Sequence, residues 1–268
     1  MTQNTHNRMF RLLLSLVFVM VSLSCGADKN VDWSDANSMN VEQFAHSNIV
    51  LPIDGVPEQI LLRKSYIVSY NSEKRCPNWA AWRLTADHTT GPVGRMNAFH
   101  EDPDVPEPRA TLDDYYDSGY SRGHLCPAGD NKWDRDAMYE TFLLSNICPQ
   151  NANLNSGLWN QIEISTRRWA EKYGEVYVIT GPMYFRSNQL RLIGNGVAVP
   201  DAFFKVILCL HPAKAIGFIC RNIEGQGKKD MYVNSLRQVE RLTGMHFFPS
   251  LASDVRSRIE NDANIKDW

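Results

Sequence analysis

The sequence has little of three features that would settle its class at once. Its most apolar stretch, residues 12–23, is too short to cross a bilayer, which takes about 20 apolar residues. Its charges almost cancel, with 28 Lys and Arg against 30 Asp and Glu, whereas a sequence-specific nucleic-acid binder usually has a strongly basic domain. A protein that grips only a few phosphates needs no such excess. There is also no internal repeat and no low-complexity tract.

What the sequence does contain is enough apolar residues for a full core. A chain of 268 residues that is 43% hydrophobic fits one large domain or two small ones. Strand and helix patterns alternate without a linker, which predicts a single α+β domain over residues 59–268, with a central mixed or antiparallel sheet flanked by helices. We expect strands at residues 60–70, 80–85, 175–180, 202–210 and 216–223. We expect helices at residues 134–144, 156–172 and 233–242.

The first 24 residues have the composition of an export signal. Arg8 and Arg11 precede the apolar stretch, an order that is typical of a signal peptide. The stretch ends at Ser22-Leu23-Ser24-Cys25-Gly26, which resembles a bacterial lipoprotein cleavage site with Cys25 as the acylated residue. Ordinary cleavage nearby, with a soluble product, is the alternative. We therefore expect residues 1–24 to be removed and the chain to be exported by a bacterium, to the periplasm, the cell surface or an outer-membrane anchor.

Residues 25–58 differ in composition from the rest of the chain. They are rich in Asn, Asp and Ser and show no strong hydrophobic period. This composition predicts a tether between a lipid anchor at Cys25 and the folded domain.

One stretch, residues 120–130, concentrates groups suited to phosphate chemistry. Its sequence Arg122-Gly123-His124 places a permanent cation next to an imidazole. The planar guanidinium donates two parallel hydrogen bonds to phosphate oxygens, and histidine can accept a proton near neutral pH. Gly123 would let the backbone turn without a Cβ, so that both side chains address one small volume. Three residues alone also fit a loop arginine beside a buried structural histidine.

Further polar residues recur at fixed offsets downstream. Together with Arg122-Gly123-His124 they resemble the DNA/RNA non-specific endonucleases of the ββα-metal (His-Me finger) class, over roughly residues 60–250. In that family Asp-Arg-Gly-His is followed by Ser-Asn, Pro-Gln, Asn, Trp and Glu. One position departs, since Ser121 stands where the family has Asp. The matching residues are Ser145-Asn146, Pro149-Gln150, Asn155, Trp159 and Glu163.

The resemblance implies how phosphodiester hydrolysis would be divided among these residues. The reaction needs a base for water, positive charge near phosphorus and a partner for the departing oxygen. His124 would be the base. Arg122 would bind phosphate, and Arg95 lies where the family has a second phosphate-binding arginine.

The resemblance also implies a divalent cation, Mg²⁺, for which Mn²⁺ could substitute. Asn155 would be its sole direct protein ligand, which suits Mg²⁺ because this ion keeps several of its waters. Glu163 would hold the metal through one of those waters. Asn146 would position the site.

By the same resemblance, the substrates are DNA and RNA and the products carry 5′-phosphates. A site that contacts only the phosphate backbone carries no base information, which agrees with little sequence preference. The oligomeric state is left open by the sequence.

Two alternatives stay open at this point. His124, Cys126 and Cys148 could be zinc ligands, as in a nucleobase deaminase, although the Cys-x-x-Cys of such a site is absent. A lipoprotein that binds nucleic acid or an envelope partner on a degenerate nuclease scaffold is the non-enzymatic alternative. A pure binder, however, would not need His124, Asn155 and Glu163 all intact.

Apart from the proposed lipid attachment site, five cysteines remain. An exported protein permits disulfides, and an odd number leaves one thiol unpaired. Cys126 and Cys148 flank the proposed site and could be bridged. Cys209 and Cys220 lie on the two arms of a predicted hairpin and could pair across strands, which would leave Cys76 free.

Overall fold

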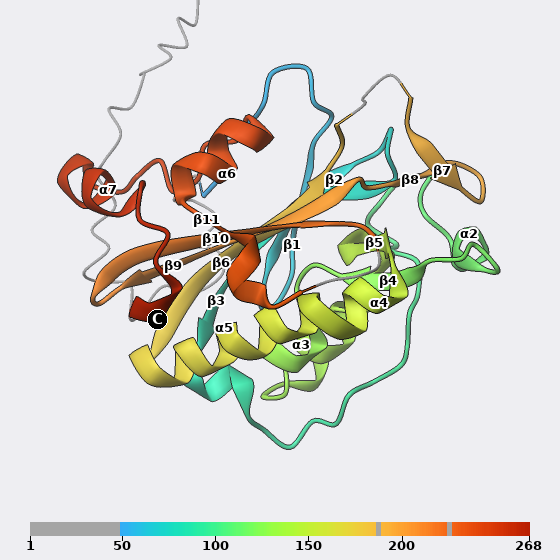
Figure 1. Cartoon of the computed structure of the whole chain (residues 1–268). Helices are drawn as coiled ribbons and strands as arrows, with labels where there is room; N and C mark the ends of the chain where they lie inside the picture. Colours follow the sequence, from blue (N-terminus) through green and yellow to red (C-terminus); the bar gives the residue numbers. More distant parts are fainter. Residues whose placement is uncertain (1–48, 186–188, 224–226) are drawn as a thin grey trace, which may run out of the picture.

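The computed structural model describes residues 49–185, 189–223 and 227–268 (Figure 1). The expected signal peptide, its lipid attachment site at Cys25 and most of the expected tether lie outside the described residues. In the described ranges, no helix combines the length and the hydropathy of a membrane span.

The folded domain begins earlier than the expected boundary at residue 59. Ile49 and Val50 are buried, with 3% and 7% of their surface exposed. Val50 forms an antiparallel bridge with Phe247, and the amide of Phe248 donates to the carbonyl of Ile49 at 2.7 Å. The boundary was placed too late because these two apolar residues carry no periodic pattern, although they cover part of the core.

In the described residues, seven strands form one central sheet. They are β1 (Gln59–Leu62), β2 (Ile67–Asn71), β3 (Cys76–Thr85), β6 (Glu175–Met183), β9 (Ala202–Leu210), β10 (Ala213–Arg221) and β11 (Val233–Asn234). Their order in the sheet is β1-β2-β3-β6-β9-β10-β11, and all the pairs are antiparallel. The α+β class is confirmed, and the sheet is antiparallel rather than mixed.

Helices cover both faces of this sheet (Figure 1). The α-helices of the described residues are α2 (Leu112–Tyr115), α3 (Arg135–Glu140), α4 (Ala152–Leu154), α5 (Asn160–Tyr173), α6 (Leu236–Thr243) and α7 (Ser253–Ile259). α5 lies along one face with α3 nearby, whereas α6 and α7 lie over the other. Ile162 and Trp169 of α5 belong to one apolar cluster, and Leu236 and Val239 of α6 belong to a second on the opposite face.

The strand expected at residues 60–70 is divided in two. β1 and β2 pair with each other, and the amide of Arg63 donates to the carbonyl of Tyr66 at 2.8 Å across the turn between them. The polar residues at 63–65 are therefore a hairpin turn. Residue composition alone did not reveal this turn because it contains neither Gly nor Pro.

The helix expected at residues 156–172 is present as α5, but it starts later. The preceding segment, η5 (Asn155–Trp159), is a π-helical turn in which Gly157 departs from helical dihedral angles. Gly174 ends the helix with a φ of 86°, a conformation that favours glycine. The irregular turn is thus the segment that carries Asn155.

The two cysteines of the predicted hairpin do not face each other. In the β9–β10 register Cys209 lies opposite Lys214, whereas Cys220 lies opposite Phe203. Their positions differ by six residues along the strand (203 against 209), or about 20 Å at the rise of a β-strand, and a disulfide spans no more than about 7 Å between Cα atoms. All five cysteines in the described residues are free thiols, so this expectation is wrong.

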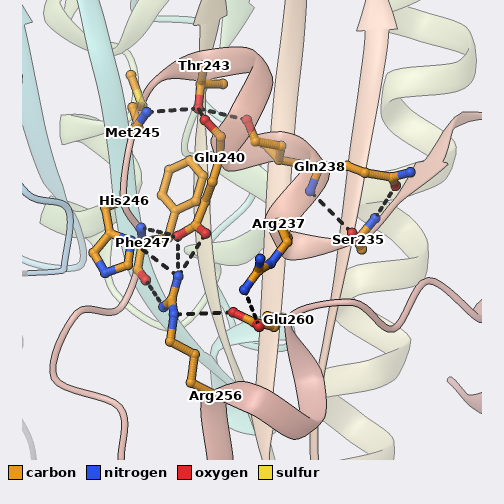
Figure 2. A network of polar contacts seen from close by, with 11 residues as sticks. Ser235, Arg237, Gln238, Glu240, Thr243, Met245, His246, Phe247, Arg256 and Glu260 are labelled. Atoms are coloured by element: carbon orange, nitrogen blue, oxygen red, sulfur yellow. Dashed lines mark hydrogen bonds and ion pairs between the residues drawn. The ribbon is translucent and has the colours of Figure 1, made fainter. Parts of the chain in front are cut away.

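A polar network fastens α7 to α6 (Figure 2). Glu240 on α6 accepts from Nη2 of Arg256 on α7 at 2.6 Å and from the amide of Phe247 at 2.9 Å. Arg256 also donates to the carbonyl of Phe247 at 2.9 Å. A second ion pair joins Arg237 to Glu260. These contacts hold the α6–α7 layer on the second apolar cluster.

Replacing Arg256 with alanine should lower the free energy of unfolding by about 2 kcal/mol, because Glu240, which is 14% exposed, would keep its charge without that partner. Arg258→Ala is the matched control. Arg258 lies on the same helix and pairs with Asp254 at the exposed surface, where an ion pair is worth about 0.5 kcal/mol or less. Chemical denaturation measures both values, and equal losses would contradict a stabilising role for the Glu240–Arg256 pair.

Candidate active site

The Arg122-Gly123-His124 stretch lies on a short strand, not in a turn. β4 (Ser121–His124) pairs antiparallel with β5 (Ile147–Gln150), so that Gly123 lies opposite Cys148. The expected role of Gly123 as a turn residue is therefore wrong. A Cβ at this position would lie 2.4 Å from Oε1 of Gln150, so glycine is needed because the glutamine side chain fills that space.

β5 leads into α4, η5 and α5, so that two strands and a helix form one continuous ββα unit. Asn146, the last residue of the 3-10 turn η4 (Leu144–Asn146) before β5, is fully buried and joins this unit to the segment that follows β4. Its Oδ1 accepts from the amide of Cys126 at 2.9 Å, and its Nδ2 donates to the carbonyls of Cys126 and Thr141, each at 2.9 Å. Both amide hydrogens of Asn146 are thus used within the protein, which agrees with the expectation that it positions the site and does not bind substrate.

The expected bridge between Cys126 and Cys148 is also not formed. The sulfur of Cys126 accepts from Nδ2 of Asn131 at 3.5 Å, and the thiol of Cys148 contacts that of Cys76 instead. The zinc alternative required both thiols to converge on His124. In residues 49–185, 189–223 and 227–268, no three His, Cys, Asp or Glu side chains are grouped so that they could hold a metal ion.

Two arginines face the site, and neither has a carboxylate partner in the described part of the chain. Cζ of Arg122 lies 4.3 Å from the ring centre of Phe99, and Cζ of Arg95 lies 5.6 Å from the ring centre of Phe142. Both arginines are exposed, and both line a pocket of about 560 Å³. Positive charge without an internal counter-ion attracts an anion, and a phosphate matches the fork of a guanidinium group.

His124 lies against the two rings over which these arginines lie. The centre of its imidazole is 5.2 Å from that of Phe99 and 4.9 Å from that of Phe142. The side chain is 8% exposed, and Nε2 is buried without a hydrogen-bond partner among the described residues. Burial, followed by the charges of Arg95 and Arg122, lowers the pKa of His124 to about 3. The imidazole is therefore neutral at neutral pH.

A neutral imidazole is the form that can accept a proton. A base with such a low pKa is weak, but its basicity would change when an anion binds. The negative charge of a phosphodiester beside Arg95 and Arg122 would offset their two positive charges and raise the pKa of His124. An anion bound at the two arginines would thus make the histidine more basic.

Asn155 and Glu163 have unengaged side-chain oxygens. Asn155 lines the same pocket as the two arginines, and its side chain makes no hydrogen bond within the described residues. Glu163 is partly buried, and its carboxylate makes no hydrogen bond or ion pair there either. One neutral oxygen ligand with a carboxylate further along the same helical segment fits a hydrated divalent cation such as Mg²⁺, which retains most of its waters.

Sequence reasoning missed a set of buried charges next to Glu163. Nη1 of Arg167 donates to Oδ1 of Asp130 at 2.8 Å, and the indole of Trp82 donates to the other oxygen at 3.1 Å. Asp130 is 4% exposed, so both partners compensate a buried charge. The four-residue spacing of Glu163 and Arg167, which places them on one face of α5, is the signal that could have identified Arg167.

Lys205 completes this set. It is 1% exposed and lies between two indoles, with its Nζ 5.0 Å from the ring centre of Trp82 and 4.8 Å from that of Trp159. Burial raises the pKa of Glu163 to about 7, against the opposing effect of the positive charge of Lys205. The carboxyl group therefore exchanges its proton near neutral pH, and a cation bound beside it would favour the ionised form.

Comparisons with known proteins agree with this geometry. Residues 46–254 match the DNA/RNA non-specific endonuclease family. The mitochondrial nuclease EXOG of Mus musculus is 36% identical over 221 residues, which cover 72% of this chain and 58% of that protein. Nuclease C1 of Cunninghamella echinulata var. echinulata is 37% identical over 233 residues, which cover 80% of this chain and 90% of that protein. The chain thus spans less than two thirds of the length of the mouse relative.

A solved structure shows the same fold. The crystal structure of the EndoG/EndoGI complex contains a chain that matches this one with a TM-score of 0.68 and 30% sequence identity. The match covers 74% of this chain and 89% of that chain.

The raised pKa of Glu163 predicts a pH dependence of stability. Without divalent cations, the folded protein holds this proton up to about pH 7, whereas the unfolded carboxyl releases it near its ordinary pKa of 4.5. The stability that the neutral carboxyl contributes is complete below pH 4.5 and is lost as the pH rises to about 7. Relative to wild type, Glu163→Gln should therefore gain stability across this window and level off above it.

Thermal unfolding of wild type and Glu163→Gln in EDTA, from pH 4 to 8, measures this difference. The low pKa of His124 affects both proteins alike and cancels. Excess Mg²⁺ at pH 8 should reverse the order, because only the ionised glutamate gains from a cation. A difference that stays constant with pH would contradict the raised pKa.

Proposed function

The chain belongs to the DNA/RNA non-specific endonuclease family, and from this premise we propose that it hydrolyses phosphodiester bonds of both DNA and RNA in a Mg²⁺-dependent reaction. It cuts internally with little sequence preference and leaves 5′-phosphate ends. The observation that carries this proposal is a pocket lined by two arginines without carboxylate partners in the described residues, each of which lies over a phenylalanine ring that contacts a neutral, buried histidine.

His124 is the general base in this mechanism. Its neutral imidazole takes a proton from the water that attacks phosphorus, and the 3′-oxygen leaves, so that the phosphate stays on the 5′ side. Arg122 and Arg95 hold the non-bridging oxygens and offset the negative charge that grows on them. Gln150 and Gly123 keep β4 close to β5, which fixes the backbone that carries His124.

Asn155 would hold the divalent cation through its side-chain oxygen, and Glu163 would accept hydrogen bonds from the waters of that ion. When bound, the cation supplies positive charge that stabilises the transition state and the departing oxygen. Mn²⁺ could take the same place, because it also prefers oxygen ligands. Asn155 lies in the π-helical turn that precedes α5, outside the regular helix.

Breadth of substrate follows from the chemistry of these side chains. Arg95, Arg122 and Asn155 address phosphate oxygens or a cation that binds them, and such contacts carry no base identity. The name of Nuclease C1 describes a nuclease, and the family's description names both DNA and RNA. These names support the proposed range of substrates.

A degenerate nuclease scaffold that only binds nucleic acid or an envelope partner is the alternative. It would require phosphate-binding arginines but not an unengaged base or an unengaged metal ligand. His124, Asn155 and Glu163 all retain side-chain atoms without partners in the described residues. Leaving a buried polar atom such as Nε2 of His124 without a hydrogen bond lowers the stability of the fold, which favours a role for this atom in the reaction.

Export is proposed from the N-terminal sequence. Mitochondrial targeting peptides are amphipathic, whereas residues 12–23 form an apolar run behind Arg8 and Arg11. This pattern supports a signal peptide, even though the EXOG relative is named as mitochondrial. Lipid attachment at Cys25 would then place the enzyme at the periplasmic or outer surface of a bacterial envelope, close to nucleic acids outside the cytoplasm.

Replacing His124 with alanine should leave the fold intact and reduce the cleavage rate by about 10²–10⁴-fold, which is the usual contribution of a general base. Nicking of a supercoiled plasmid and cleavage of an RNA oligonucleotide, each with Mg²⁺ and with EDTA, measure the activity. His211→Ala is the control, because His211 is an exposed histidine in the β9–β10 turn. Wild-type turnover by a folded His124→Ala protein would remove His124 from the mechanism.

Replacing Asn155 with alanine should raise the Mg²⁺ concentration needed for half-maximal activity, because the cation loses its direct ligand. Glu163→Ala should cost less, about 10–100-fold in activity or metal affinity, since its contact runs through water. Asn153→Ala, an exposed change on the preceding α4, should behave as wild type. A Mg²⁺ titration of each variant measures this, and an unchanged requirement in Asn155→Ala would exclude it as the ligand.

A further inference from the structure

Two phenylalanines link the groups assigned to the base and to phosphate binding. Phe99 contacts His124, with ring centres 5.2 Å apart, and Cζ of Arg122 lies over the face of Phe99, 4.3 Å from its ring centre. Phe142 contacts the same imidazole, with ring centres 4.9 Å apart, and Cζ of Arg95 lies 5.6 Å from the ring centre of Phe142. The two rings meet edge to face, 5.0 Å apart. All three functional side chains are therefore in contact with one aromatic pair.

Polar contacts do not explain how these side chains are oriented. In the described residues, no side-chain hydrogen bond or ion pair is made by His124, Arg95 or Arg122. Each of them has ring contacts in place of hydrogen-bond partners. The face of a benzene ring carries negative charge in its quadrupole, so it attracts a guanidinium group electrostatically and not only through its area.

The two rings are themselves held firmly. Phe142 is fully buried, and Phe99 is packed against the same small apolar cluster, which includes Met138. The amide of His100 donates to the carbonyl of Phe142 at 3.2 Å, and the amide of Leu144 donates back to the carbonyl of His100 at 2.9 Å. The segments that contribute the two rings are thus tied together by backbone hydrogen bonds on both sides.

We propose that Phe99 and Phe142 are positioning residues of the proposed nuclease, forming an aromatic platform that orients His124 and presents Arg122 and Arg95 to the phosphate. This inference rests on the proposed function. Both rings limit the rotation of the imidazole, and each of them holds one guanidinium group in place before substrate arrives. A group held in place in advance loses less conformational entropy when phosphate binds.

The two rings should contribute differently. Arg122 lies close to the face of Phe99, so Phe99 should act chiefly on binding. Arg95 lies further from Phe142, and the buried ring of Phe142 packs edge to face against the imidazole (interplanar angle 89°), so Phe142 should act chiefly on the orientation of the base. A cation–π contact at an exposed site corresponds to about a two- to fivefold change in affinity.

The test separates the charge of the ring face from its volume. Phe99 is replaced by 4-fluoro-, 3,5-difluoro- and 3,4,5-trifluorophenylalanine, which keep the shape of the ring and weaken its quadrupole step by step. Affinity for a fluorescein-labelled single-stranded oligonucleotide is measured in EDTA, where no cleavage takes place. Affinity should fall with each fluorine, to about two- to fivefold in total, and KM in Mg²⁺ should rise in parallel while kcat changes little.

Leucine at position 142 tests the orientation of the base, and leucine at position 99 tests binding. Phe142→Leu should lower kcat about tenfold or more with a smaller change in KM, because misplacing a catalytic group is costly. Phe99→Leu should lose affinity, which Phe99→Tyr should retain because it keeps an aromatic face. Melting temperatures identify any variant that fails to fold. If the leucine variants fail to fold, the fluorinated series still tests the proposal, because it keeps the shape of the ring.

Phe204 provides the matched control. It is a fully buried phenylalanine in the apolar cluster on the opposite face of the sheet, where it packs against Phe247. The same fluorinated series at Phe204 should leave affinity and KM unchanged. A flat series at Phe99, together with normal affinity in Phe99→Leu, would overturn the platform. A wild-type protein that bound oligonucleotide without cutting it would contradict the proposed function alone, and the fluorinated series would still decide the platform by affinity.

Discussion

The uncompensated charge of Arg95 and Arg122 beside a buried imidazole is the interaction on which the rest of the site depends. Burial opposes protonation of His124 most strongly, and the two guanidinium groups oppose it further. The folded protein tolerates these charges because each one lies over an aromatic ring and remains exposed to water. An anion bound between them would relieve the repulsion and make His124 more basic, so in the proposed mechanism one electrostatic event would both bind substrate and activate the base.

The charges next to Glu163, unlike those of Arg95 and Arg122, are compensated within the protein. Asp130 is paired with Arg167 and accepts a second hydrogen bond from Trp82, so its buried charge is compensated within the protein. Lys205 lies against the same indole, on the neighbouring part of the sheet. The contacts of Asp130 link α5 to β3, and Lys205 links β9 to the same indole of β3. They leave the carboxylate of Glu163 without a partner in the described residues, which agrees with the role proposed for it toward the waters of a cation.

Sequence reasoning proposed the candidate site residues but not the contacts that arrange them. Local periodicity and a glycine cap were enough to predict α5, and strong apolar runs were enough to predict β6 and β9. The pairing of β4 with β5 was missed because both strands are four residues long, and the true reason for Gly123 is a side chain far along the sequence, Gln150. The same limit applies to Cys209 and Cys220, since strand register, not residue spacing, decides which thiols meet.

The aromatic residues of the site also bear on specificity. Proteins that bind single strands without reading their sequence commonly stack bases on exposed aromatic faces, a contact that every base can make. Here the face of Phe99 is taken by Arg122, and Phe142 is buried against His124. Neither ring is free to stack on a base, and the groups that they carry recognise only charge. A site that uses its aromatic rings to orient cations would address the phosphate backbone in place of the bases, and backbone contacts carry no base identity. This agrees with the breadth of substrate proposed for this chain.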